Sequence, residues 1–113
     1  MASIKEDISK KIQELQVLEQ NLQHFLMEKQ SIQAELNEIS NAIEELKKSS
    51  GDSYRVIGGI MVKSSPSELI KDLDDKKNIL VLRISAVEKQ EKLVEDKANS
   101  IKKEVSESVS KNK

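Results

Sequence analysis

Apolar residues recur at alternating steps of three and four along the first half of the chain. In order, these positions are Ile4, Ile8, Lys11, Leu15, Leu18, Leu22, Phe25, Lys29, Ile32, Leu36, Ile39, Ile43 and Leu46, and the two lysines are the polar ones. Most residues between them are Glu, Gln, Lys, Asn or Ser, as a face exposed to water requires. The spacing predicts a helix over residues 3–50 with a coiled-coil seam, and Ser3 and Glu6 fit a capping box at its start.

A second and weaker seam begins shortly after residue 65. Ser65, Pro66 and Glu68 are typical of a helix start, because Ser65 and Glu68 fit a capping box and proline is tolerated at the first helical position. The seam positions are Ile70, Leu73, Lys77, Leu80, Ile84, Val87, Glu91, Val94, Ala98, Ile101, Val105 and Ser108. This pattern predicts a second helix over residues 65–109.

The segment between the helices predicts a β-hairpin over residues 53–63. Strand-type residues flank Gly58 and Gly59, and glycine supplies the positive φ angles that a two-residue hairpin turn needs. Such a turn pairs Ile57 with Ile60, Val56 with Met61 and Arg55 with Val62. The residues expected to form the hairpin surface are Tyr54, Val56, Ile57, Gly58, Gly59, Ile60, Met61 and Val62.

Both faces of this hairpin are apolar near the turn. Alternation places Ile57, Ile60 and Val62 on one face, and Val56 and Met61 on the other. A lone hairpin is marginally stable in water and has two unpaired edges, which one pair of helices cannot cover together with both faces. We therefore expect hairpins of several chains to combine into a shared sheet or barrel. The alternative is a hairpin folded back on its own helices.

The two helices are of similar length, and the hairpin reverses the chain between them. The expected fold is therefore mainly α, a long antiparallel two-helix coiled coil in one domain, residues 1–113. The facing residues would be Leu46 and Ile70, Leu36 and Leu80, Ile32 and Ile84, Leu22 and Val94, and Leu15 and Ile101. The polar seam residues Lys29 and Glu91 fall about one turn apart across the pair. They either extend separately into water or form an ion pair that fixes the register, and we expect the former.

Composition excludes several classes of protein. Charged residues make up 35% of the chain and aromatic residues 2%, which is typical of long helices with solvated faces. A formal net charge of −1 favours neither nucleic acid nor an acidic membrane as a partner. The chain has no cysteine and no apolar stretch of membrane-spanning length, and we expect no signal peptide after Met1. We expect a cytoplasmic protein.

No constellation of residues supports catalysis. The sequence has no phosphate-binding loop, and its single histidine, His24, is expected to be a surface imidazole. The carboxylate pairs Asp74-Asp75 and Glu95-Asp96 point about 100° apart on a helix, so they do not converge on a substrate. We expect neither an enzyme nor a bound metal or cofactor.

At the ends away from the hairpin, the two helices are expected to pack poorly along their seam. Ile8 would face Ser108 and Lys11 would face Val105, which leaves apolar side chains partly exposed. These tip residues are Met1, Ile4, Ile8, Ile12, Ile101, Val105 and Val109. From the residues alone, fraying is the simpler interpretation, and a flexible apolar patch that binds other proteins is the alternative.

The hairpin Tyr54–Val62 and the helix segments around it resemble the archaeal type of the prefoldin β-subunit family. The resemblance extends over nearly the whole chain and includes Met27-Glu-Lys-Gln30, Leu80-Val-Leu-Arg-Ile84 and Val87-Glu-Lys-Gln90. Family hairpins often carry Gly-Asn in the turn where this chain has Gly58-Gly59. With a single hairpin, this chain resembles the β type of subunit, since the α type has a second hairpin between its helices.

The resemblance implies a function that the periodicity does not. It implies a hexamer of two α and four β subunits, joined by hairpins in a double β-barrel, with coiled coils projecting from it. This assembly would be an ATP-independent co-chaperone that holds unfolded proteins at the tips and delivers them to a group II chaperonin. With the resemblance, the tip patch becomes the favoured interpretation. The alternative is a structural coiled-coil adaptor without this holding activity.

Overall fold

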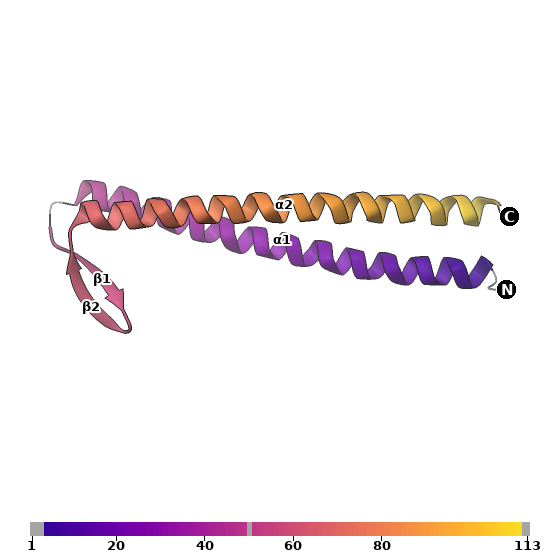
Figure 1. Cartoon of the computed structure of the whole chain (residues 1–113), viewed down its shortest axis with the longest axis horizontal. Helices are drawn as coiled ribbons and strands as arrows, with labels where there is room; N and C mark the ends of the chain where they lie inside the picture. The colour runs from indigo at the N-terminus through magenta and orange to yellow at the C-terminus, as the bar shows by residue number, and fades with distance from the viewer. Residues whose placement is uncertain (1–3, 50, 112–113) are drawn as a thin grey trace. The chain divides into compact units, whose positions relative to one another are not determined.

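The computed structural model describes residues 4–49 and 51–111. Helix α1 (Ile4–Lys48) is followed by strand β1 (Ser53–Ile57), strand β2 (Ile60–Ser64) and helix α2 (Pro66–Lys111) (Figure 1). The predicted mainly α fold, two long helices joined by one hairpin, is confirmed. Met1, Ser3 and Ser50 lie outside the described residues, so the proposed capping box at Ser3 is not described.

The start of α2 follows from its sequence. The Ser65 hydroxyl accepts a hydrogen bond from the Glu68 amide at 3.3 Å, and the Ser65 carbonyl accepts one from the Leu69 amide at 3.1 Å. Pro66 is the first helical residue, where its missing N–H leaves no bond unmade. Ser65 is therefore the N-cap that the sequence predicts.

The chain packs into two compact units. One unit comprises residues 30–85, with the hairpin and the helix segments next to it. The other comprises residues 1–29 and 86–113, with the beginning of α1 and the end of α2. We call them the hairpin unit and the tip unit.

The hairpin unit has a core of aliphatic side chains from both helices. Its buried cluster consists of Ile32, Leu36, Ile39, Ile43 and Leu80, against which Ile70, Leu73 and Ile84 pack. Leu36 and Leu80 share this cluster, as an antiparallel pairing of the two seams requires. At its margin, Lys76 Nζ lies 3.2 Å from Glu35 Oε1.

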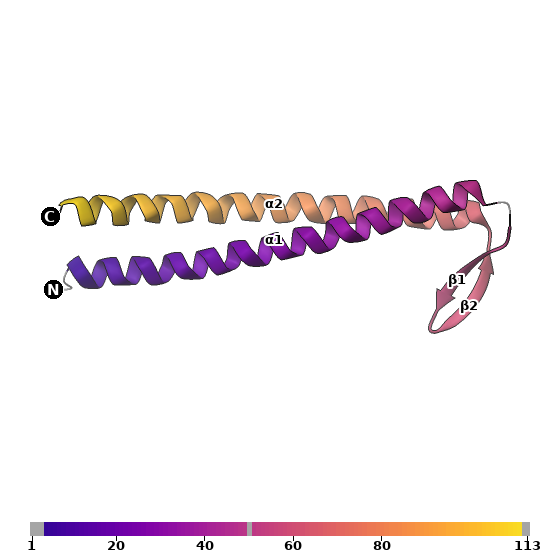
Figure 2. The ribbon, with the colours of Figure 1, turned by 180° about the vertical axis from the view of Figure 1, so that it is seen from behind.

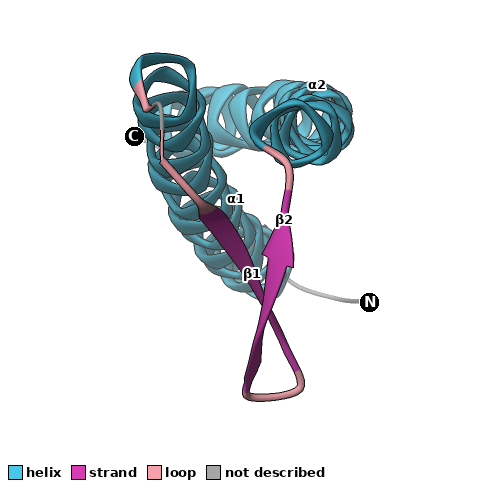
Figure 3. Cartoon of the chain, turned by 90° about the vertical axis from the view of Figure 1, so that its left-hand side faces the viewer, coloured by secondary structure: helices cyan, strands magenta, loops and turns pink. Residues whose placement is uncertain are grey.

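The hairpin has the predicted register. Arg55 pairs with Val62, Val56 with Met61 and Ile57 with Ile60, and the ladder continues to Ser53 and Ser64. Gly58 and Gly59 have φ angles of 54° and 80°, which suit a two-residue turn that follows the twist of the strands. The twist is plain in Figure 3, where β1 and β2 cross when seen end-on.

The tip unit has a smaller core. Leu18, Ala98 and Ile101 are buried together, with Leu15, Val94 and Val105 packed against them. In this unit the start of α1 and the end of α2 lie at the same end (Figure 2). Ion pairs flank the core, joining Lys97 to Glu14 at 3.4 Å, Lys102 to Glu19 at 3.8 Å and Lys11 to Glu104 at 3.3 Å.

Lys29 and Glu91 are paired, which corrects the expectation that they extend separately into water. Lys29 Nζ donates a hydrogen bond to Glu91 Oε1 at 2.8 Å, and both side chains are mostly covered. Both residues interrupt apolar seams, so their charged ends meet where the neighbouring packing limits access of water. The hydrogen bond from Lys29 to Glu91 raises the pKa of Lys29 above its ordinary value, assisted by the charges of Glu91, Glu88 and Glu95 and opposed by partial burial.

Candidate interaction surfaces

The hairpin exposes its apolar side chains on both faces. Tyr54, Val56, Ile57, Ile60, Met61 and Val62 are between 44% and 69% exposed. The alternative in which the hairpin buries these side chains on its own helices is therefore wrong. Such a concentration of exposed β-branched and aromatic residues is typical of a surface that another protein covers.

The hairpin also has two free edges. In the described residues the sheet has two strands, β1 and β2, so the outer side of each has no neighbouring strand. Unpaired edges favour the addition of a strand from another chain. No heavy atom lies within 4 Å of a Cβ built on Gly58 or Gly59, so the turn is open as well.

An ion pair ties the hairpin to α2. Arg55 on β1 pairs with Asp72 on α2 through Nη2 and Oδ2. A second pair, Lys63 to Asp52 at 3.4 Å, lies at the base of the hairpin. Sequence reasoning missed the Arg55–Asp72 pair, because neither the period of a strand nor that of a helix relates the two positions.

The predicted tip residues differ in how accessible they are. Ile4, Ile12 and Val109 are exposed, and Ile8 and Val105 are half-buried. Ile101 is buried in the core of the tip unit, and Met1 lies outside the described residues. A hollow of about 200 Å³ opens at this end, lined by Ile4, Asp7, Ile8, Lys11, Ser108 and Lys111.

The rest of the described chain offers little for chemistry. Residues 4–49 and 51–111 contain no group of His, Asp and Glu side chains arranged to hold a metal ion, and His24 is exposed. No helix in those ranges is both long and apolar enough to cross a lipid bilayer. The exposed apolar surfaces at the hairpin and the tip therefore remain the main candidates for function.

The sequence profile of one known family, described as prefoldin subunit, matches residues 9–112. The chain belongs to the prefoldin subunit family. Prefoldin subunit beta of Saccharolobus islandicus is 31% identical over 93% of this chain and 85% of its own length. Prefoldin subunit beta of Sulfurisphaera tokodaii is 32% identical over 93% of this chain and 86% of its own.

Solved structures agree with the sequence relatives. The crystal structure of the prefoldin beta subunit from Thermococcus strain KS-1 matches with a TM-score of 0.84 and 26% identity, covering 93% of this chain and 94% of that one. The predicted similarity to the archaeal β type of prefoldin is thus confirmed. Prefoldins are co-chaperones built from several subunits, so the exposed hairpin belongs to a protein that assembles with other prefoldin subunits.

Proposed function

We propose that this chain is a subunit of an ATP-independent co-chaperone that binds unfolded proteins at its helix tips and delivers them to a group II chaperonin. The main support is the arrangement of exposed apolar groups in a prefoldin subunit. Among them, one set lies on the hairpin and another at the ends of the helices.

The hairpin is the proposed assembly site. Its two apolar faces and free edges would be covered by strands of neighbouring subunits, in a double β-barrel of two α-type and four β-type chains. Ile57→Asp or Ile60→Asp would place an unpaired charge in that barrel and separate the subunits. Light scattering after mixing with the α-type partner measures this, and an unchanged full mass would contradict the shared barrel.

The tip is the proposed client site. Ile4, Ile12 and Val109 present apolar surface, and the half-buried Ile8 and Val105 adjoin it. Ile101 would support the patch from beneath, because it is buried in the described structure. Several weak tips in one assembly would hold a client by avidity, which suits binding of many different sequences.

Aggregation of an unfolded test protein, measured without nucleotide, tests the client site. The assembled complex should suppress aggregation. Removal of residues 1–10 and 106–113 should abolish suppression while the oligomer stays intact, because the cut leaves the Leu18 cluster in place. Equal protection by the trimmed oligomer would contradict the tip site. An oligomer with one stoichiometric partner and no suppression at all would instead favour the structural adaptor.

A further inference from the structure

Two large apolar side chains lie next to each other on the surface of α2, outside the coiled-coil seam. Ile79 is 59% exposed and Leu82 is 71% exposed. They are three residues apart, which makes them neighbours on the surface of a helix. The seam of α2 is formed here by the buried Leu80, and a two-helix coiled coil needs one apolar seam on each helix. Packing of α1 against α2 therefore does not explain the Ile79–Leu82 pair.

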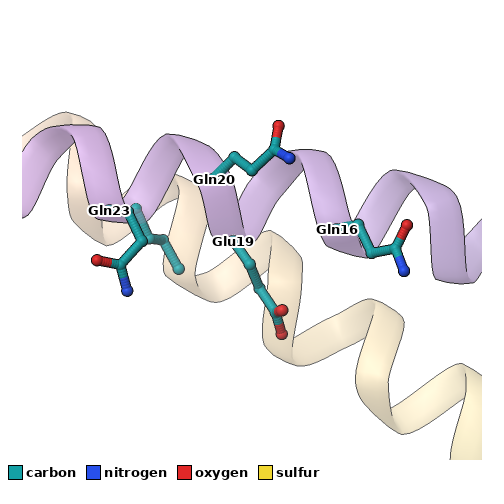
Figure 4. Close-up of a pocket in the computed structure, with 5 residues that line it drawn as sticks. Gln16, Glu19, Gln20 and Gln23 are labelled. Carbon is teal, nitrogen blue, oxygen red and sulfur yellow. The ribbon is translucent and has the colours of Figure 1, made fainter.

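Leu93 shows how an isolated apolar residue on the same helix differs from this pair. It is also 71% exposed, but its neighbours one turn away in either direction are all polar: Lys89, Gln90, Asp96 and Lys97. A shallow hollow on α1 in the tip unit (Figure 4) is likewise bordered mainly by polar side chains, Gln16, Glu19, Gln20 and Gln23. Single apolar residues among polar ones are normal on a protein surface, whereas adjacent ones form a patch that another element can cover.

The hairpin turns one of its apolar faces toward α2. Arg55 pairs with Asp72 of α2, so the face of the hairpin that carries Arg55 is directed at this helix. Ser53 lies at the base of the same face and is buried. Alternation along β1 and pairing with β2 place three apolar residues on this face: Ile57, Ile60 and Val62. They remain between 44% and 67% exposed, so the part of the face near the turn is uncovered.

The Ile79–Leu82 pair continues the side of α2 to which the hairpin is tied. Ile79 follows Asp72 by seven residues, which is about two turns, so both side chains leave the helix on the same side. At a rise of about 1.5 Å per residue, the pair lies about 10–15 Å beyond Asp72 along α2. The turn of the hairpin lies in the same direction from its base (Figure 1). Two uncovered apolar surfaces are therefore found on one side of the hairpin unit.

The chain's own hairpin is too short to cover this pair. Beyond Arg55, strand β1 continues for two residues to Ile57, which is about 7 Å at the rise of a strand, before the chain turns back. Leu82 lies about 15 Å beyond Asp72. Because the ion pair holds Arg55 at Asp72, the hairpin ends before it reaches Leu82. An element that covers both Ile79 and Leu82 has to come from another chain.

We propose that the Ile79–Leu82 pair packs against the hairpin of a neighbouring prefoldin subunit, an inference that rests on the proposed assembly role of the hairpin. A strand added to a free edge of this hairpin continues its sheet and presents alternate side chains to α2. Adjacent strands in a closed barrel are staggered along their length. Of the two neighbours, one at each edge, one is therefore displaced toward Leu82. The interface between subunits thus extends from the barrel onto α2.

A double substitution tests this interface in the assembly with the proposed α-type partner. Ile79→Gln and Leu82→Gln remove the apolar pair but keep a residue that favours helix. The matched control, Val81→Gln and Leu93→Gln, removes two exposed apolar side chains of the same helix that lie off this face or beyond the reach of a hairpin. The measurement is the concentration of partner at which half of the chain is assembled, determined by light scattering.

We expect this concentration to rise about tenfold or more for the Ile79–Leu82 variant, because two apolar side chains no longer lose contact with water on assembly. The control should stay within about twofold of the unmodified chain. Circular dichroism melting of the unassembled chains should be the same for both variants, since all four side chains are exposed. Assembly of the Ile79–Leu82 variant at the unmodified concentration would overturn the inference, as would an equal loss in the control.

Crosslinking identifies the element that covers the pair. The chain has no cysteine, so Asn78→Cys, one turn from Leu82, accepts a single photoreactive label, and Asn99→Cys serves as the control. The labelled chain is assembled with the α-type partner and an excess of isotope-labelled unmodified chain, and the products are analysed by mass spectrometry. We expect the label at residue 78, and not the one at residue 99, to join a hairpin peptide of the α-type partner or of an isotope-labelled copy. Products with the chain's own hairpin, with an added unfolded protein, or with no subunit at all would overturn the inference.

The variant Ile57→Asp separates failure of the inference from failure of the proposed function. If it leaves the mass of the assembly unchanged, the hairpin is not the assembly site, and the inference falls with that proposal. If it separates the subunits while the Ile79–Leu82 variant assembles as tightly as the unmodified chain, the hairpin joins the subunits without α2 and the inference alone is overturned.

Discussion

Lys29 Nζ and Glu91 Oε1 lie 2.8 Å apart at a place where a charged residue interrupts both apolar seams. Replacing both with leucine should raise the melting temperature of the protein, because a continuous apolar seam removes the cost of holding two charges away from water. Replacing Lys29 alone with leucine should lower it, since Glu91 is then left without its partner. Circular dichroism melting of the three proteins checks this order, and a single variant as stable as the double one would contradict it.

The same pair predicts a dependence of stability on alkaline pH. The hydrogen bond to Glu91 raises the pKa of Lys29 above its ordinary value of 10.5, so the folded state holds this proton more tightly than the unfolded state does. The stabilisation is therefore complete below pH 10.5 and is lost as the pH rises through the raised pKa. Melting temperatures of the unmodified protein should fall more steeply above this pH than those of Lys29→Met. If the melting temperatures of the two proteins fall in parallel as the pH rises, the Lys29–Glu91 pair contributes nothing to stability.

Two leucines of α2, two positions apart, test which face of the helix forms the seam. Leu80 is 3% exposed and Leu82 is 71% exposed. Leu80→Ala should cost about 2–5 kcal/mol of unfolding free energy because it leaves a cavity in the hairpin unit, whereas Leu82→Ala should cost less than about 0.5 kcal/mol. Urea unfolding of both variants measures the difference, and equal losses would place the seam elsewhere.

The turn predicts a graded response at Gly58. Its φ of 54° lies in the left-handed region, and a Cβ there meets no atom within 4 Å, so the cost of a side chain is conformational. Gly58→Asn should be nearly neutral, whereas Gly58→Val should destabilise the hairpin by about 1–2 kcal/mol. The rate at which a protease cleaves the hairpin in the unassembled chain measures this destabilisation. Equal cleavage rates in the two variants would contradict a turn that needs a left-handed conformation at residue 58.

Arg55 and Asp72 predict a charge-reversal rescue. Arg55→Asp or Asp72→Arg should release the hairpin from α2 and reduce the assembled fraction, and the double variant should recover much of it. The effect is small, below about 1 kcal/mol, because both side chains are partly exposed. Assembly should therefore be measured by titration with the proposed α-type partner, at concentrations near the midpoint of binding. A double variant that assembles no better than either single one would show that the pair does not position the hairpin.

The sequence predicted those features that follow from a repeating period or from backbone conformation. The spacing of the seam residues predicted both helices and placed Leu36 opposite Leu80, because burial of one helix face imposes that spacing. Gly58 and Gly59 indicated the hairpin register to the residue, because a two-residue turn leaves one pairing.

The remaining features depend on three-dimensional distances that no period encodes. Whether Lys29 reaches Glu91 depends on how far apart the helices lie locally, and the two outcomes have the same sequence pattern. Arg55 meets Asp72 only through the angle between the hairpin and α2.

The ion pairs of the tip unit give it a sensitivity to ionic strength. In the tip unit, three ion pairs between a lysine and a glutamate join the two helices beside a small apolar core: Lys11–Glu104, Lys97–Glu14 and Lys102–Glu19. The hairpin unit has a larger aliphatic cluster. Salt weakens attraction between exposed charges and leaves apolar packing intact or strengthened. A rise in salt concentration should therefore loosen the tip unit, the proposed client site, before it disturbs the hairpin unit, the proposed assembly site. If both proposals hold, a cell's osmotic state would adjust capture of unfolded proteins without dismantling the assembly.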